Sequence, residues 1–181
     1  MKYKVSYLLI VSCLFLTSCS QSKEIQNNWE QNKVCKWNDY YKNAERPYED
    51  FELEMTLEDF PDVTFKWTEF SVTAIENGNK KGMIAGMPVY SIYFTDLTND
   101  GFPEICSTVM FGSGIIDTHI EVFDYKNDKN YTLCERTLYD YNLIMKDDKL
   151  LVEKRPYGYY EDDRVETGNL IIEDDILKFI Q

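Results

Sequence analysis

Turn-forming tetrapeptides separate short apolar-rich runs in this chain, and this pattern is the feature that most constrains its fold. Three of them, at 126–129, 146–149 and 173–176, each place aspartate or asparagine between two apolar-rich runs. Asparagine and aspartate tolerate the positive φ angles of tight turns, so these segments predict hairpin loops. No long stripe with helical period and no fixed-period repeat interrupts the pattern. We therefore expect an all-β chain, an antiparallel meander folded as a single sheet or a small sandwich.

Alternation of apolar and polar residues locates the expected strands. In the run 105–111, for example, Ile105 and Val109 should point to one face of the sheet, while Cys106 and Thr108 point to the other. A buried cysteine in such a strand behaves as a small core residue. The remaining strands are expected at 51–55, 63–67, 70–75, 90–94, 120–123, 131–133, 143–145, 150–153, 170–172 and 177–180.

The amino-terminal segment follows a different pattern. A basic start with Lys2 and Lys4 precedes the short apolar run 5–16, and small residues then lead to Cys19. The apolar run is shorter than the roughly 20 residues that a membrane-spanning helix needs. Basic, apolar and small segments in this order are typical of a secretory signal peptide.

The four residues 16–19, Leu-Thr-Ser-Cys, resemble the lipobox of bacterial lipoproteins. This resemblance implies cleavage just before Cys19 and covalent attachment of diacylglycerol and a fatty acid such as palmitate to that residue. Several acyl chains on one cysteine would hold the protein at the cell membrane, facing the extracytoplasmic side. The alternative is an ordinary cleavable signal peptide with a chance cysteine, which would release the protein.

These features divide the chain into three parts. We expect a signal peptide over 1–18, a lipid-anchored tether over 19–45 and a β-rich extracytoplasmic domain over 46–181. The tether is rich in glutamine and asparagine. It is expected to be disordered or to contain a short helix that includes Trp29 and Trp37.

The charge of the chain excludes one class of partner. Acidic residues outnumber basic residues by 32 to 19, which gives a formal net charge of −13. A surface of this sign repels the phosphates of nucleic acids and attracts cations. We therefore expect no nucleic-acid binding. Fourteen tyrosines and ten phenylalanines supply enough apolar mass for a packed core, so the chain is not expected to be disordered as a whole.

One loop has an arrangement that suits a metal ion. Asp96, Thr98 and Asp100 place side-chain oxygens at alternate positions, Glu104 closes the turn, and the carbonyl of Phe102 would add a backbone ligand. The loop resembles the calcium-binding loop of the FG-GAP family of extracellular repeats, and the resemblance implies a calcium site here. The alternative is a plain turn, in which the two aspartates accept hydrogen bonds from nearby amides.

A broader resemblance covers residues 50–180 and is carried by the segments 60–67, 93–106 and 111–117. These segments are similar to extracytoplasmic domains of clostridial-type lipoproteins and of β-lactam-sensor-like metallopeptidases. The chain lacks the H-E-x-x-H zinc motif of the peptidases, so the resemblance does not imply their catalysis. It implies an accessory or sensing module whose ligand is unassigned.

We therefore expect a non-catalytic binding or sensing domain with one structural calcium ion. Two alternatives stay open: an envelope glycan hydrolase that uses paired carboxylates, or a docking subunit of an envelope protein assembly. The acidic connection between the last two hairpins carries Tyr157, Tyr159 and Tyr160. These side chains would form a partner surface, or they would cover the edge of the sheet.

The remaining cysteines, Cys35, Cys106 and Cys134, are odd in number. They allow one disulfide with one free thiol, or three free thiols, and we expect no essential disulfide. His119 is the only histidine, and no pair of cysteines has C-x-x-C spacing. This spacing does not predict a zinc cage.

Overall fold

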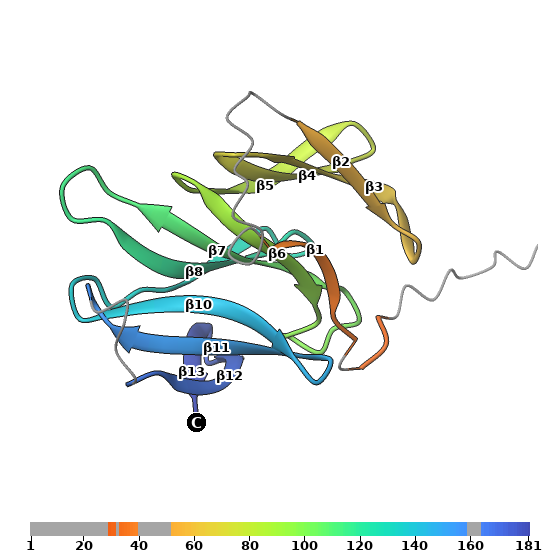
Figure 1. Ribbon diagram of the computed structural model, residues 1–181. Helices are drawn as coiled ribbons and strands as arrows, with labels where there is room; N and C mark the ends of the chain where they lie inside the picture. The colour runs from red at the N-terminus through yellow and green to blue at the C-terminus, as the bar shows by residue number, and fades with distance from the viewer. Residues whose placement is uncertain (1–28, 32, 40–51, 159–163) are drawn as a thin grey trace, which may run out of the picture.

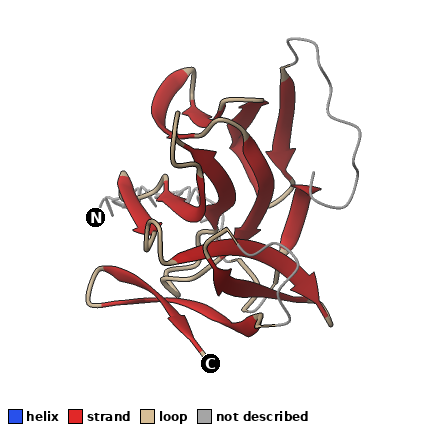
Figure 2. Cartoon of the chain, turned by 60° about the vertical axis from the view of Figure 1, so that its left-hand side comes forward, coloured by secondary structure: helices blue, strands red, loops and turns tan. Residues whose placement is uncertain are grey.

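The computed structural model describes residues 29–31, 33–39, 52–158 and 164–181. Every element of regular secondary structure in these ranges is a β-strand, drawn as a red arrow in Figure 2. The strands form three antiparallel sheets, which confirms the predicted all-β class. Within the same ranges there is no helix with the length and apolar character needed to span a membrane.

Each sheet is built mainly from strands that are consecutive in the chain. The first sheet contains β2 (Leu53–Leu57), β3 (Phe60–Thr68), β4 (Ser71–Glu76) and β5 (Asn79–Ala85). The central sheet has the order β1 (Cys35–Asp39), β6 (Val89–Thr95), β7 (Glu104–Phe111), β8 (Asp117–Asp124) and β9 (Lys129–Leu133). The third contains β10 (Tyr139–Lys146), β11 (Lys149–Pro156), β12 (Glu166–Glu173) and β13 (Ile176–Ile180). Within the three sheets, only the pairing of β1 with β6 joins strands that are not consecutive in the chain.

The three sheets stack as layers, with the five-stranded sheet in the middle (Figure 1). Its side chains alternate between two hydrophobic cores, one against each outer sheet. As the sequence predicts, Ile105 and Val109 lie in one core and Cys106 lies in the other. The stack has one layer more than a sandwich, because the central sheet is apolar on both faces. The largest fully buried side chains of the two cores include Phe65, Trp67, Phe94, Phe123, Tyr93 and Tyr141.

The turns explain why the chain reverses so often. Asp147 and Asp148 both have positive φ, 50° and 58°, and so do Asp174 and Asp175, at 54° and 60°. Two consecutive positive φ angles define the two-residue turn whose twist matches that of a hairpin. The predicted hairpins at 146–149 and 173–176 are therefore confirmed. Strands β8 and β9 are likewise antiparallel neighbours, joined by the four-residue loop 125–128, so the hairpin predicted at 126–129 is also confirmed.

The segment expected to be a tether contributes to the domain. Within 19–45, the predicted short helix around Trp29 and Trp37 is wrong. Trp29 is buried outside any regular element, and Trp37 belongs to strand β1. Strand β1 pairs with β6, and the Trp37 ring stacks near Phe94 at a centroid distance of 6.2 Å. An extended segment is favoured here because β6 would otherwise present an unpaired edge.

Buried hydrogen bonds connect the central sheet to the third sheet. The Thr108 hydroxyl donates to Asn142 Oδ1 at 3.2 Å and accepts from the Leu143 amide at 2.9 Å. The Thr118 amide donates to Asp140 Oδ1 at 2.9 Å. Because the surroundings exclude water, these bonds fix how the two sheets align.

The substitution Thr108→Val should lower the free energy of unfolding by about 1–3 kcal/mol, because it leaves the Leu143 amide and the Asn142 carbonyl buried without a partner. Urea unfolding of the two proteins measures the difference. Thr108→Ser is the matched control, since it keeps the hydroxyl and loses one methyl group. A Thr108→Val protein as stable as the parent would show that these bonds do not hold the sheets together.

Candidate functional site

The loop 96–103 lies between the two most buried strands of the molecule. Strand β6 ends at Thr95 and β7 begins at Glu104, and both are covered by the outer sheets. The chain reverses with positive φ at Asn99 (59°) and Gly101 (84°). The ends of the loop are therefore held rigidly, while its tip reaches the surface.

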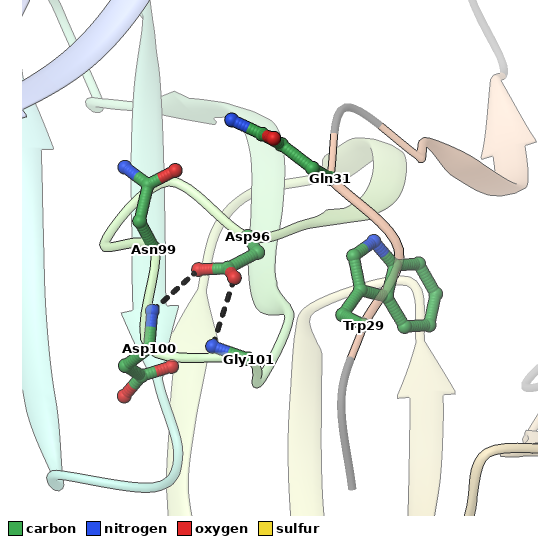
Figure 3. Close-up of a pocket in the computed structure, with 6 residues that line it drawn as sticks. All are labelled: Trp29, Gln31, Asp96, Asn99, Asp100 and Gly101. Carbon is green, nitrogen blue, oxygen red and sulfur yellow. Dashed lines mark hydrogen bonds between the residues drawn. The ribbon is translucent and has the colours of Figure 1, made fainter.

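Within the loop, carboxylates accept hydrogen bonds from backbone amides (Figure 3). Asp96 accepts from the amides of Asp100 at 3.2 Å and Gly101 at 2.9 Å. Asp100 Oδ1 accepts from the Phe102 amide at 2.9 Å. These are the bonds that the plain-turn alternative predicts, so the structure confirms that turn.

The loop also brings three predicted metal ligands together. One oxygen from each of Asp96, Asp100 and Glu104 lies within 4.8 Å of the other two. Glu104 is 1% exposed, and its carboxylate accepts hydrogen bonds from the Leu97 amide at 2.6 Å and the Thr98 hydroxyl at 2.8 Å. The turn and a cation site therefore use the same geometry. Calcium binding, with Thr98 and the Phe102 carbonyl as further ligands, stays a prediction.

Two residues that the sequence analysis missed extend this cluster. Asp124, which is 2% exposed, ends strand β8 beside Glu104 at the start of β7. The Asn127 side-chain amide donates to Asp124 Oδ2 at 2.8 Å and to Asp100 Oδ2 at 3.2 Å. The pairing of Ile105 with Phe123 places Glu104 and Asp124 side by side. Only the pairing of distant strands reveals Asp124 and Asn127 as neighbours of the loop, because both are far from it in the sequence.

The cluster carries more negative charge than its surroundings compensate. Burial raises the pKa of the Glu104 carboxyl to about 7, and the charges of Asp124 and Asp96 add to the increase, while the bonds from Leu97 and Thr98 oppose it. Burial and the charge of Glu104 also raise the pKa of Tyr125 far above its usual value. The Tyr125 hydroxyl is buried and finds no hydrogen-bond partner in the described part of the chain. A bound cation would relieve this repulsion.

A cavity of about 400 Å³ opens beside the loop (Figure 3). One wall comes from the amino-terminal segment, where the Trp29 amide donates to the Gly101 carbonyl at 2.8 Å. Glu104 is not one of the residues that line this cavity. The lining residues are Trp29, Gln31, Asp96, Asn99, Asp100 and Gly101.

The other predicted site residues lie apart from this loop. Tyr157 is partly buried, and its amide donates to the Leu138 carbonyl at 3.0 Å. Tyr159, Tyr160 and the lipidation residue Cys19 fall outside the described residues. Their predicted roles therefore stay predictions.

The three described cysteines are free thiols: Cys106 is buried, Cys35 is half-buried and Cys134 is exposed. Although Cys134 as a residue is exposed, partial burial of its thiol, together with the hydrogen bond to Asp117, raises the pKa of this thiol to about 11. This thiol is therefore protonated near neutral pH and is a poor nucleophile.

No protein-family model, no curated protein and no solved structure matches the chain. The proposed ligand is accordingly inferred from the geometry and charge of the loop 96–104.

Without metal, stability should fall as the pH rises from about 4.5 to about 7, because the pKa of Glu104 is higher in the folded state than in the unfolded chain. The unfolded chain gives up its proton first, so the Glu104 contribution is fully present below pH 4.5 and is lost by pH 7. The expected loss is roughly 2–3 kcal/mol. Urea unfolding in a chelator at several pH values measures it.

Glu104→Gln is the control for this pH effect, since glutamine keeps the shape and cannot ionise. The variant should be more stable than the parent at pH 8, and the difference should shrink at pH 5. Equal pH dependence in the two proteins would contradict the assignment to Glu104.

Proposed function

We propose that this chain is a membrane-anchored lipoprotein whose extracytoplasmic β-domain binds calcium at the loop 96–104 and uses the adjacent cavity for binding or sensing. One observation carries the proposal: oxygens of Asp96, Asp100 and Glu104 converge within 4.8 Å of one another. The three carboxylates come from nine residues of chain that begin and end in buried strands. Such a rigid frame favours ion binding because little order must be gained.

The chemistry of the ligands favours calcium over softer metals. The three groups that converge here are all carboxylates, and calcium prefers carboxylate, carbonyl and water oxygens in a flexible arrangement. Asp96, Asp100 and Glu104 would hold the ion, with the Thr98 hydroxyl and the Phe102 carbonyl as further ligands. Asp96 and Asp100 also line the cavity, which provides a path of entry. An affinity on the order of 10⁻⁴–10⁻³ M would suffice outside the cell.

A bound ion would couple the loop to the cavity. The ion would neutralise Asp96 and Asp100, which form one wall of the cavity. It would also fix the position of Gly101, whose carbonyl accepts a hydrogen bond from the Trp29 amide in the opposite wall. The cavity can admit a small polar ligand or a segment of an envelope protein. We therefore assign the domain to binding or sensing.

The hydrolase alternative has weaker support. A carboxyl with a pKa of about 7, as in Glu104, would suit a general acid. Glu104 is 1% exposed, however, and both of its oxygens accept hydrogen bonds from within the loop. A substrate in the cavity would not reach it. No contact of the described residues favours the docking-subunit alternative.

Calcium should raise the melting temperature of the full chain in a saturable way, because an ion that binds only the folded state stabilises it. At one hundred times Kd the gain is about 2.7 kcal/mol. Asp100→Asn should remove the effect, since it deletes a charge and keeps the oxygen that accepts from the Phe102 amide. Differential scanning calorimetry with added calcium measures both proteins.

Asp148→Asn is the matched control for the calcium experiment. Asp148 is an exposed turn residue with positive φ in a different hairpin, and asparagine tolerates that φ. This variant should respond to calcium as the parent does. The calcium proposal fails if the parent shows no shift, or if Asp100→Asn shifts as much as the parent.

The anchor is tested separately from the ion. In a bacterial host, the protein should partition into detergent and incorporate a labelled palmitate analogue, because several acyl chains give near-permanent membrane association. Cys19→Ala should abolish both. Mass spectrometry that finds an unmodified Cys19 on the processed protein would contradict lipidation and leave the calcium proposal intact.

A further inference from the structure

A second cluster of chemically different side chains lies on the central sheet, away from the loop 96–104. Asp117 and His119 alternate along β8, so their side chains point to the same face. Ile120 pairs with Leu133 across β8 and β9, which places Cys134 opposite His119. The sheet thus brings a carboxylate and an imidazole of β8 together with the thiol of the residue that follows β9.

The contacts within this cluster match the spacing of ligands around one metal ion. Cys134 Sγ donates to Asp117 Oδ2 at 3.2 Å, and His119 Nδ1 lies 3.7 Å from Asp117 Oδ1. One ligand atom from each of Asp117, His119 and Cys134 lies within 4.8 Å of the other two. Tetrahedral zinc with bonds of about 2.0–2.3 Å separates its ligands by roughly 3.3–3.8 Å. Small side-chain rotations would therefore complete the site.

The histidine supplies a second, independent observation. His119 Nδ1 is buried and finds no hydrogen-bond partner among the described residues. The other ring nitrogen, Nε2, lies 3.3 Å from Glu121 Oε1, which is where the proton of a neutral imidazole is most favourable. The lone pair of Nδ1 then faces the Asp117 carboxylate. Two facing acceptors repel each other unless a metal ion or a second ring proton lies between them.

We propose that Asp117, His119 and Cys134 bind a zinc-class divalent metal ion, with Glu121 as the residue that orients the imidazole. Sulfur and nitrogen ligands select zinc over calcium or magnesium, so this site differs in kind from the loop 96–104. Three protein ligands leave the fourth position to water. Cys134 is exposed, which gives the ion a route from solvent. Binding displaces the Sγ proton to solvent, because the ligand is the thiolate.

Cobalt(II) titration of the full chain tests this proposal directly, because a cobalt–thiolate bond gives a near-ultraviolet charge-transfer band and four-coordinate cobalt absorbs visible light. We expect one cobalt ion per chain, displaced by zinc. Cys134→Ser should remove the charge-transfer band, and His119→Gln should weaken binding at least tenfold. Glu121→Gln should weaken it by roughly 10-fold or more while the band persists, which is the signature of a positioning residue.

Two controls separate this site from the other thiols and from the calcium loop. Cys35→Ser alters another free thiol and should keep the band. Asp100→Asn should also keep it, and excess calcium should not displace the cobalt. Absence of the band in the parent, or its persistence in Cys134→Ser, would overturn the proposal. Circular dichroism of each variant confirms that it is folded.

Discussion

Strands β6 and β7 are covered on both faces, so their side chains must alternate between two separate cores. All seven residues of β6 are buried, as are the first six of β7. Polar groups in these strands therefore need partners within the protein, and the structure supplies them: Thr108 bonds across to the third sheet, and Glu104 bonds to its own loop. The candidate site is rigid because its loop joins two strands that are buried on both faces.

The same burial places carboxyl groups of like charge close together at the candidate site. Glu104 and Asp124 lie together because the register of β7 and β8 requires it, and neither is accessible to water. The charge of Asp124 adds to the burial that raises the pKa of the Glu104 carboxyl to about 7, and a nearby cation would lower this pKa again. The nearby Asp96 and Asp100 provide further ligands for such a cation. Asp117 and His119 likewise face each other at short range, and the Cys134 thiol beside them adds sulfur to the nearby ligand atoms.

Local patterns in the sequence predicted the strands, the hairpins at 146–149 and 173–176, and the loop that gathers Asp96, Asp100 and Glu104. These features depend on alternation and turn chemistry, which act over a few residues. The third layer, the pairing of β1 with β6 and the contribution of Trp29 depend on contacts between distant segments. Asp124 and Cys134 were missed as site residues for the same reason, since only strand register brings them to their partners.

We propose that carboxylates of the loop 96–104 bind a calcium-like cation beside the cavity. Trp29 lines that cavity with Asp96 and Asp100, so it can transfer excitation energy to a lanthanide bound there. Terbium luminescence on tryptophan excitation is therefore the most direct measurement. We expect sensitised emission that calcium suppresses and that a Trp29→Leu variant lacks. Emission that is absent from the parent protein, or that calcium leaves unchanged, would contradict it.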